Sequence, residues 1–157
     1  MITNFPTNPK MNLAGLSTFL FIPRYQVKTV PDIDLKIINT PIELKSGYEW
    51  LKGYSTLETL QFTEKGNSDD PGTSCEPSLK GFMPGDLPEI TLLFEEMEQL
   101  RHVIITKDMM GKLRIVGLHE PLEFTSSFNS GQNVGDSRGY SFEFFGESLK
   151  KAPYYMR

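Results

Sequence analysis

The chain has 157 residues, of which 38% are hydrophobic and 23% are charged, and these values are ordinary for one soluble globular domain. Its formal net charge of -4 without a basic run argues against nucleic-acid binding, which requires several phosphate-neutralising side chains on one face. The single cysteine, Cys75, cannot form an internal disulfide, and no apolar run approaches the roughly 20 residues of a membrane-spanning helix. We therefore expect a soluble cytoplasmic protein without a signal peptide, a membrane contact or a nucleic-acid partner.

The first residues differ in composition from the rest of the chain. Residues 1–12 are polar and contain Pro6 and Pro9, a composition typical of a flexible terminal arm. No later linker is long enough to divide the chain. The sequence therefore predicts a flexible N-terminal arm at residues 1–12 and a single β-rich domain at residues 13–157.

Strand signals fill the first half of this domain. Alternating apolar and polar residues, bounded by proline or glycine, predict strands near residues 15–22, 35–38, 48–54, 56–63 and 77–83. Trp50, the only tryptophan, lies in one of these strands, and we expect it to anchor a core. Residues 64–76 carry two glycines, one proline and two adjacent aspartates, and this composition predicts a loop.

The stretch DLPEITLLFEEMEQL predicts one amphipathic helix at about residues 87–100. Asp86 is expected to be its N-cap, with Glu89 completing a capping box and Pro88 in the first turn. Apolar residues recur at helical spacing and form one stripe, namely Ile90, Leu93, Phe94, Met97 and Leu100. A single helix of this length is not stable in isolation, so we expect the stripe to pack against a sheet.

After the helix, the sequence returns to strands joined by glycine-containing turns. Alternation predicts strands at residues 101–108, 112–118, 121–129 and 139–146. Asp108 and Gly111 mark a hairpin turn between the first two of these strands. Phe145 interrupts the polar face of the last strand, so it either caps a core or contacts another subunit.

No pattern of reactive residues predicts catalysis. The two histidines, His102 and His119, stand near no GxSxG motif, and Cys75 has no local signature of a nucleophile. One cysteine and two histidines without paired spacing do not indicate zinc, and the pair Asp69 and Asp70 offers too few oxygen ligands for calcium. The glycine-rich loop before the last strand lacks the GK[ST] of a phosphate-binding loop. We therefore expect a non-enzyme with no catalytic residue, metal or cofactor.

The last third of the chain carries a resemblance. It reads IITKDMMGKLRIVGLHEPLEFTSSFNSGQNVGDSRGYSFEFFGESLKKAPYY from residue 104 to residue 155. A D-x-x-G turn, a VG strand, a PL-x-F strand, a glycine loop, an aromatic strand and a P-x-Y tail follow one another. This order resembles small structural proteins of Bacteroidota prophages and tailed phages. The upstream order of strands, loop and helix is similar to tail-tube proteins and to the tube protein of type VI secretion.

The resemblance implies a fold, a mode of assembly and a set of positions that hold the fold. Proteins of that kind form a small β-barrel or sandwich with one flanking helix, and they stack as hexameric rings. The positions it implies are Asp108, Gly111, Gly117, Pro121, Leu122, Gly139, Tyr140 and Gly146. The long extended hairpin by which tube subunits contact the next ring is not identifiable in this sequence, so a terminator, neck or baseplate component stays open beside a tube.

Together these observations predict a mainly β (α+β) protein, an antiparallel β-barrel or sandwich with one flanking helix. The expected function is that of a non-enzymatic assembly protein of a phage tail or tail-like particle, acting through oligomerisation. Its expected partners are copies of itself in a ring and other tail proteins. The alternative is a monomeric binding module for carbohydrate or peptide, with Trp50, Tyr140 and Phe145 as a platform. The candidate contact residues are Trp50, Phe145, Tyr154 and Tyr155.

Overall fold

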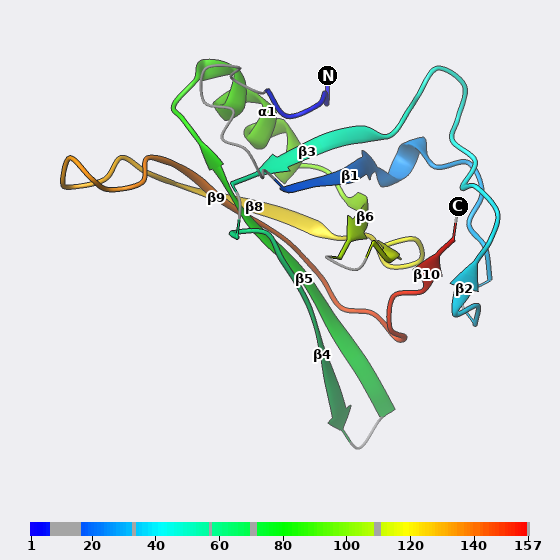
Figure 1. The fold of residues 1–157 in the computed structure, drawn as a ribbon. Coiled ribbons are helices and arrows are strands. Elements are labelled where there is room, and N and C mark those ends of the chain that lie inside the picture. The colour runs from blue at the N-terminus through cyan, green and yellow to red at the C-terminus, as the bar shows by residue number, and fades with distance from the viewer. Residues whose placement is uncertain (7–16, 33, 57, 70–71, 109–110, 157) are drawn as a thin grey trace.

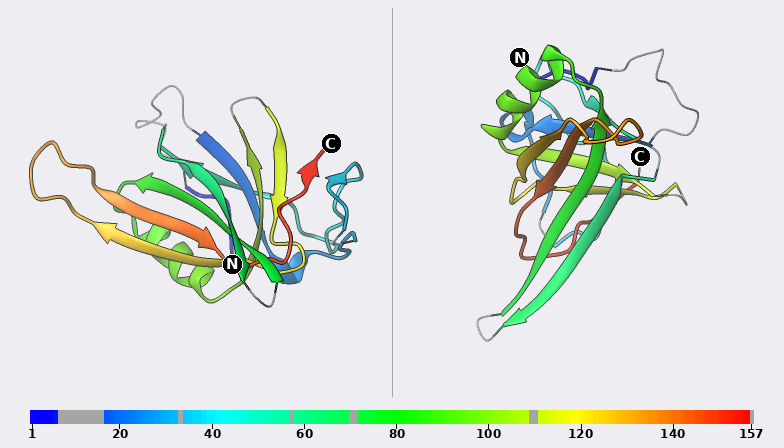
Figure 2. Two further views of the ribbon diagram at one scale, coloured as in Figure 1. Left: turned by 90° about the horizontal axis from the view of Figure 1, so that it is seen from below. Right: turned by 90° about the vertical axis from the view of Figure 1, so that its left-hand side faces the viewer.

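The computed structural model describes residues 1–6, 17–32, 34–56, 58–69, 72–108 and 111–156. The described residues form two β-sheets, which enclose a common core, and one α-helix (Figures 1 and 2). This arrangement confirms the mainly β, α+β class. The two sheets form a sandwich-like structure, and the described strands do not close into a barrel.

The larger sheet has six strands in the order β2-β10-β7-β6-β1-β3. Their bounds are Ser17–Pro23 (β1), Ile37–Ile38 (β2), Leu51–Ser55 (β3), His102–Lys107 (β6), Leu113–Val116 (β7) and Tyr154–Tyr155 (β10). Neighbouring strands are antiparallel except β10 and β2, which run parallel. A short 3-10 helix, η2 (Arg24–Gln26), follows β1.

The smaller sheet has four strands in the order β4-β5-β9-β8, all antiparallel. Their bounds are Gln61–Asp69 (β4), Gly72–Pro84 (β5), Glu123–Asn129 (β8) and Gly139–Phe145 (β9). The helix α1 (Pro88–Glu98) follows β5 and packs against β8.

Aromatic side chains fill the space between the sheets. Period-two alternation directs Phe19 and Phe21 of β1 inward, where they meet Phe142 and Phe144 of β9. The rings of Phe124 and Phe144 lie 4.9 Å apart between centroids. Each large side chain buried in this way contributes about 1.5–3 kcal/mol, and each aromatic pair about 0.5–1.5 kcal/mol more. This inter-sheet core is the main source of stability in the fold.

The opposite face of the six-stranded sheet carries a second apolar cluster. Leu20 and Ile22 of β1 point to this side and pack near Val103 and Ile105 of β6. Trp50 is half-buried against the same cluster, as expected for a core anchor. Residues between η2 and β3, together with Tyr155, cover this face.

The helix agrees with its predicted stripe, but its N-terminus differs. Four residues of the stripe are buried, and the fifth packs at its edge: Ile90, Leu93, Phe94, Met97 and Leu100. The prediction that Asp86 caps the helix is wrong, because α1 begins at Pro88 and Leu87 occupies the cap without a side-chain hydrogen bond. The Asp86 carboxylate instead accepts a hydrogen bond from Arg138 Nη2 at 2.5 Å.

Residues 1–6 do not form the free arm that their composition predicts. Phe5 is only 4% exposed and its ring lies 5.2–5.6 Å from those of Phe19, Phe21, Phe94 and Phe142. Its backbone N–H donates to the Lys52 carbonyl at 2.9 Å. Ile2 is also buried, and Asn4 Oδ1 accepts the Lys52 N–H at 2.6 Å, so several contacts together hold this segment against the core. The rest of the expected arm, residues 7–12, lies outside the described residues.

The predicted loop at residues 64–76 is instead part of a long hairpin. β4 and β5 pair in register from Gln61↔Lys80 to Asp69↔Gly72. Figures 1 and 2 show this hairpin extending away from the rest of the molecule. None of the described strands outside the hairpin pairs with its outer half, so its strands need no apolar alternation and its polar composition resembles that of a loop.

The positions implied by the resemblance lie at turns and at contacts between elements. Asp108 Oδ1 accepts the Lys112 N–H at 2.8 Å, and the Gly111 N–H donates to the Asp108 carbonyl at 3.0 Å. Gly117 has a φ of 91°, and a Cβ there would approach the His102 carbonyl oxygen to 2.8 Å. This position therefore requires glycine.

The remaining positions of that set lie around Leu122 and β9. Leu122 is buried and exchanges both of its backbone hydrogen bonds with His102, which joins the two sheets. Half-buried Pro121 precedes it, and Gly146 passes close to its side chain. At the start of β9, Gly139 lies against β5, and the hydroxyl of buried Tyr140 bonds Thr91 of α1 at 2.5 Å.

Candidate assembly interface and adjoining groove

The outer half of the β4–β5 hairpin is a two-stranded ribbon. β5 pairs with β9 only over residues 78–84. Nearer the tip, Cys75 exchanges backbone hydrogen bonds of 2.7 and 2.8 Å with Ser148. Beyond Cys75, no described strand other than β4 pairs with β5. We call residues 66–69 and 72–74 the distal hairpin.

The distal hairpin is polar and accessible. Gly66, Ser68, Gly72 and Thr73 are exposed, and it contains no large apolar side chain. A two-stranded hairpin has little stability of its own in water, because it has no apolar face to bury. Such a ribbon is therefore well placed to be stabilised by contact with another chain.

The four-stranded sheet has one edge at β4 and the other at β8. None of the described strands pairs with the outer side of either edge. On β8, the N–H of Ser126 donates to Glu98 Oε1 at 3.1 Å, so the outer side of this edge lies beside α1. Near the end of β8, Phe128 is 42% exposed and its ring lies 5.0 Å from that of Tyr140. Unpaired strand edges are templates for strands of another chain.

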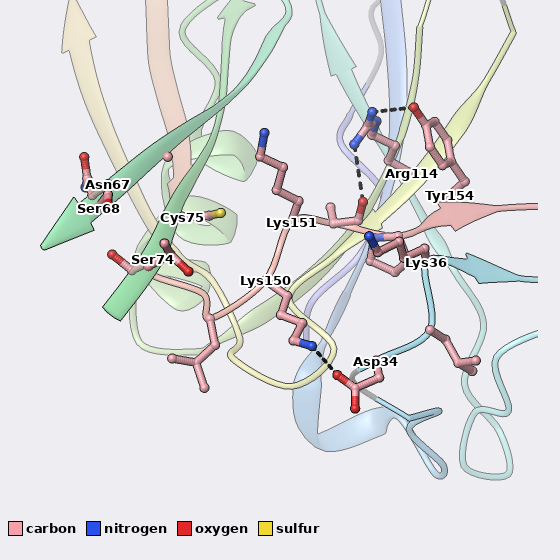
Figure 3. A pocket seen from close by; sticks show the side chains of 16 residues that line it. Asp34, Lys36, Asn67, Ser68, Ser74, Cys75, Arg114, Lys150, Lys151 and Tyr154 are labelled. Atoms are coloured by element: carbon pink, nitrogen blue, oxygen red, sulfur yellow. Dashed lines mark hydrogen bonds and ion pairs between the residues drawn. The ribbon is translucent and has the colours of Figure 1, made fainter. Parts of the chain in front are cut away.

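A groove of about 690 Å³ lies between the hairpin and the C-terminal segment (Figure 3). The hairpin contributes one wall, which includes Asn67, Thr73 and Cys75. Residues 34–36, Arg114 of β7 and residues 149–154 line the rest. These segments are distant in the sequence, and the β10 pairings with β2 and β7 bring them together.

Arg114 is held in place on the wall of this groove. Its Nη2 donates to the Tyr154 hydroxyl at 2.8 Å, and its guanidinium carbon lies 4.3 Å from the centre of the Tyr154 ring. Its Nη1 donates to the Ala152 carbonyl at 3.3 Å and lies 3.6 Å from Glu64 Oε2. Glu64 also accepts the Ala152 N–H at 2.6 Å. These contacts attach the C-terminal segment to the base of the hairpin.

The groove is positively charged although the chain is acidic. Its lining includes Lys36, Arg114, Lys150 and Lys151, against one carboxylate, Asp34. The hydrogen bond and charge of Lys150 lower the pKa of Asp34. Among the carboxylates whose side chains the structure describes, none lies within ion-pair distance of Lys36 or Lys151. These two lysines are therefore available to an acidic ligand.

The predicted contact residues lie in different environments. Tyr154 is 38% exposed in the groove wall. Tyr155 is a core residue and not a contact residue, because it is 4% exposed and its hydroxyl accepts the Ile42 N–H at 3.3 Å. Phe145 is half-buried on the outer face of the four-stranded sheet, beside the ion pair of Arg101 and Glu123.

The aromatic platform of the alternative hypothesis is not assembled. Trp50 packs on the outer face of the six-stranded sheet, whereas Tyr140 is buried in the inter-sheet core. Phe145 lies on the outer face of the other sheet. The three side chains therefore share no surface.

The reactive side chains of the described residues form no centre. No group of three or more histidine, cysteine, aspartate or glutamate residues in the described part could hold a metal ion. The ring of His102 is fully buried; its Nε2–H donates to the Met97 carbonyl at 2.9 Å, and its Nδ1 has no hydrogen-bond partner within the part of the chain that the structure describes. Burial lowers the pKa of His102, so this residue is neutral and structural. His119 is exposed, and the thiol of Cys75 is buried at the base of the hairpin.

The groove could not be found from local motifs. Its cations come from three separate segments, and only the adjacent pair Lys150 and Lys151 is visible as a cluster in the sequence. No helix in the described part of the chain is long and apolar enough to cross a membrane. Comparisons with protein-family models, with curated proteins and with solved structures found no match for this chain.

Proposed function

We propose that this chain is a non-enzymatic assembly protein of a phage tail or a tail-like particle. The observation that carries the proposal is the β4–β5 hairpin, which extends beyond the two-sheet body. The sequence resembles tube proteins but reveals no extended hairpin, and for this reason it leaves terminator, neck and baseplate roles open beside the tube. A hairpin of this kind at residues 61–84 favours the tube.

Assembly into a ring uses the two edges of the four-stranded sheet. β4 of one copy pairs with β8 of the next copy. The contact is heterologous, because the two copies contribute different surfaces. A contact of that type repeats around a ring if the rotation between copies closes. The hairpin then extends from the ring and contacts a copy in the adjacent ring.

The energetics require both contacts. A ladder along β8, which has seven residues, supplies only a few hydrogen bonds of about 1 kcal/mol each, because α1 lies beside this edge and the Ser126 N–H already bonds Glu98. Association costs about 4–15 kcal/mol in lost freedom of motion, so the edge contact alone only balances this cost. Hydrogen bonds between the polar hairpin and a neighbouring copy add the surplus, and we therefore expect assembly that depends steeply on concentration.

The test is the mass in solution by light scattering over a range of concentrations, followed by negative-stain imaging. We expect rings or stacked tubes. In a shortened variant, Asn-Gly replaces residues 68–73 and joins Asn67 to Ser74 by a two-residue turn. This variant should keep its fold by circular dichroism and lose the stacked species.

The matched control is Asp70→Asn with Pro71→Gly, which changes the same segment and preserves its length. This control should assemble like the unmodified chain. A monomer at every concentration, or stacking that survives the shortening of the hairpin, would contradict the proposal.

A further inference from the structure

β5 pairs with β4 along one edge and with β9 along the other, which we call its outward edge. The backbone hydrogen bonds along this outward edge end before the strand itself ends. β9 pairs with residues 78–84 of β5, and the N–H of Gly146 then donates to the Pro77 carbonyl at 3.3 Å. Ser148 continues the same line with its two bonds to Cys75. If this antiparallel register continued, the next hydrogen-bonded pair after Cys75 and Ser148 would be Thr73 and Lys150. Instead, the chain turns away, because the Ser148 hydroxyl donates to the Lys150 carbonyl at 2.5 Å and the Lys150 ammonium pairs with Asp34.

Thr73 therefore presents a free strand edge to the groove. In an antiparallel strand, alternate residues direct their N–H and C=O groups to the same side. The backbone groups of Cys75 point to Ser148, so those of Thr73, two residues earlier, point to the same side. No described backbone group bonds them there. Thr73 also lines the groove, so a strand entering the groove would find this N–H and C=O unpaired.

The positively charged side chains that line the groove favour an acidic strand. Lys36 and Lys151 have no carboxylate partner among the side chains that the structure describes, whereas Asp34, the only acidic residue in the described lining, is paired with Lys150. Figure 3 shows Lys151 between the hairpin and Arg114, with its side chain directed into the space between them. Leu35 and Leu149 add exposed apolar surface at the rim.

We propose that this groove binds an extended acidic segment of another protein. The segment adds as a strand to the outward edge of β5 at Thr73 and places carboxylates beside Lys36 and Lys151. Backbone pairing supplies affinity in this mode of recognition, and side-chain contacts supply specificity. The inference does not depend on association between copies of this chain.

A peptide fits the groove better than a nucleic acid. A strand edge offers one backbone donor and one acceptor in the spacing of a peptide ladder, which a sugar–phosphate chain does not match. Single-stranded nucleic acids also need free aromatic faces for stacking. The Arg114 guanidinium already lies over the Tyr154 ring, the only aromatic side chain that lines the groove in the described part of the chain.

Fluorescence anisotropy with a labelled peptide of about ten residues, in which glutamate and threonine alternate, tests the proposal. A peptide with lysine in place of glutamate and a single-stranded DNA of similar length serve as comparison probes. We expect the acidic peptide alone to bind, with an affinity that falls as salt is added. Equal binding of the DNA, or no binding of the acidic peptide at low salt, would overturn the proposal.

Two variants separate the backbone contribution from the charge contribution. Thr73→Pro removes the free N–H without breaking a bond to β4, and Thr73→Val is its matched control because it keeps that N–H. Lys36→Glu combined with Lys151→Glu reverses both unpaired charges at exposed positions. Thr73→Pro and the double charge reversal should each weaken binding on the order of tenfold or more, while Thr73→Val binds normally. Binding that is sensitive to the charge reversal but not to Thr73→Pro would overturn strand addition.

Discussion

The inter-sheet core and the distal hairpin differ in what holds them together. In the core, the ring of Phe144 contacts those of Phe21 and Phe124, and each of the three is less than 5% exposed. In the distal hairpin, the two strands share only backbone pairing and small polar side chains. One strand, β5, belongs to both regions.

This difference separates the residues that determine stability from those that we propose to act in assembly. Removing apolar atoms from the core leaves a cavity and loses transfer free energy, so the whole fold responds. The distal hairpin buries little apolar surface, so we expect changes there to leave the fold almost unaffected and, in the assembly that we propose, to act on contacts between copies. Substitutions in the core should therefore lower the free energy of unfolding, whereas substitutions in the distal hairpin should leave it almost unchanged.

Phe144→Ala should have the largest effect. Phe144 is fully buried and its ring meets those of Phe19, Phe124 and His102. We expect the free energy of unfolding in urea to fall by about 3–5 kcal/mol. Phe145→Ala is the control, because this neighbour is half-buried on the opposite face and should cost less than about 1.5 kcal/mol. Equal losses for both variants would contradict the inward and outward assignment of β9.

Gly117→Ala should destabilise the body by about 1–3 kcal/mol. The positive φ of this residue is unfavourable for alanine, and the new Cβ would meet the His102 carbonyl oxygen. That carbonyl accepts the Leu122 N–H at 2.9 Å and thereby joins the two sheets. Thermal unfolding by circular dichroism measures the loss. A variant as stable as the unmodified chain would show that this turn is not under conformational constraint.

The body should lose stability in mild acid because of His102. Burial lowers the pKa of this residue in the folded state, whereas in the unfolded chain it is about 6.5. Below pH about 6.5, the unfolded chain takes up a proton that the folded chain does not. The free energy of unfolding therefore falls as the pH decreases toward the lowered pKa, by at most about 1.4 kcal/mol per pH unit.

Urea unfolding at a series of pH values measures this effect. His119→Gln is the control, because His119 is exposed and its removal should leave the acid-induced loss in place. His102→Gln should reduce the slope of stability against pH in this range. An unchanged slope in His102→Gln would assign the acid sensitivity to other groups.

Gly66→Ala should have the smallest effect on stability. A Cβ on this residue of β4 meets no atom within 4 Å. The substitution restricts the unfolded chain, so we expect a change of less than about 1 kcal/mol, in the stabilising direction. Urea unfolding compared with Gly117→Ala measures the contrast between a glycine of the hairpin and one of the body. A loss as large as that of Gly117→Ala would show that the distal hairpin is coupled to the core.

The sequence predicts the elements whose signals are local. The stripe of Ile90, Leu93 and Met97 defines α1 because helical periodicity repeats every few residues, and Asp108 and Gly111 mark their turn directly. Tyr140, Phe142 and Phe144 alternate strictly, so the inner face of β9 is also predictable. In each case the residues that decide the structure are neighbours in the chain.

The features that local patterns miss depend on contacts between distant segments. The sequence predicts a loop at residues 64–76, where the structure has paired strands, because a ribbon without a core needs no apolar alternation. Phe5 is a single ring in a polar segment, and only the surrounding rings show why it is buried. The groove combines Lys36, Arg114 and Lys151, which have no common spacing in the sequence.

The continuity of β5 also gives the molecule a mechanical property. Thirteen residues in one strand span about 40 Å, and the inner end is bonded to β9 beside the core. A pull on the tip along β5 loads all the β5–β9 hydrogen bonds in shear, so they resist together. A pull across the sheet loads them one after another. The hairpin therefore transmits tension along its own axis far better than across it.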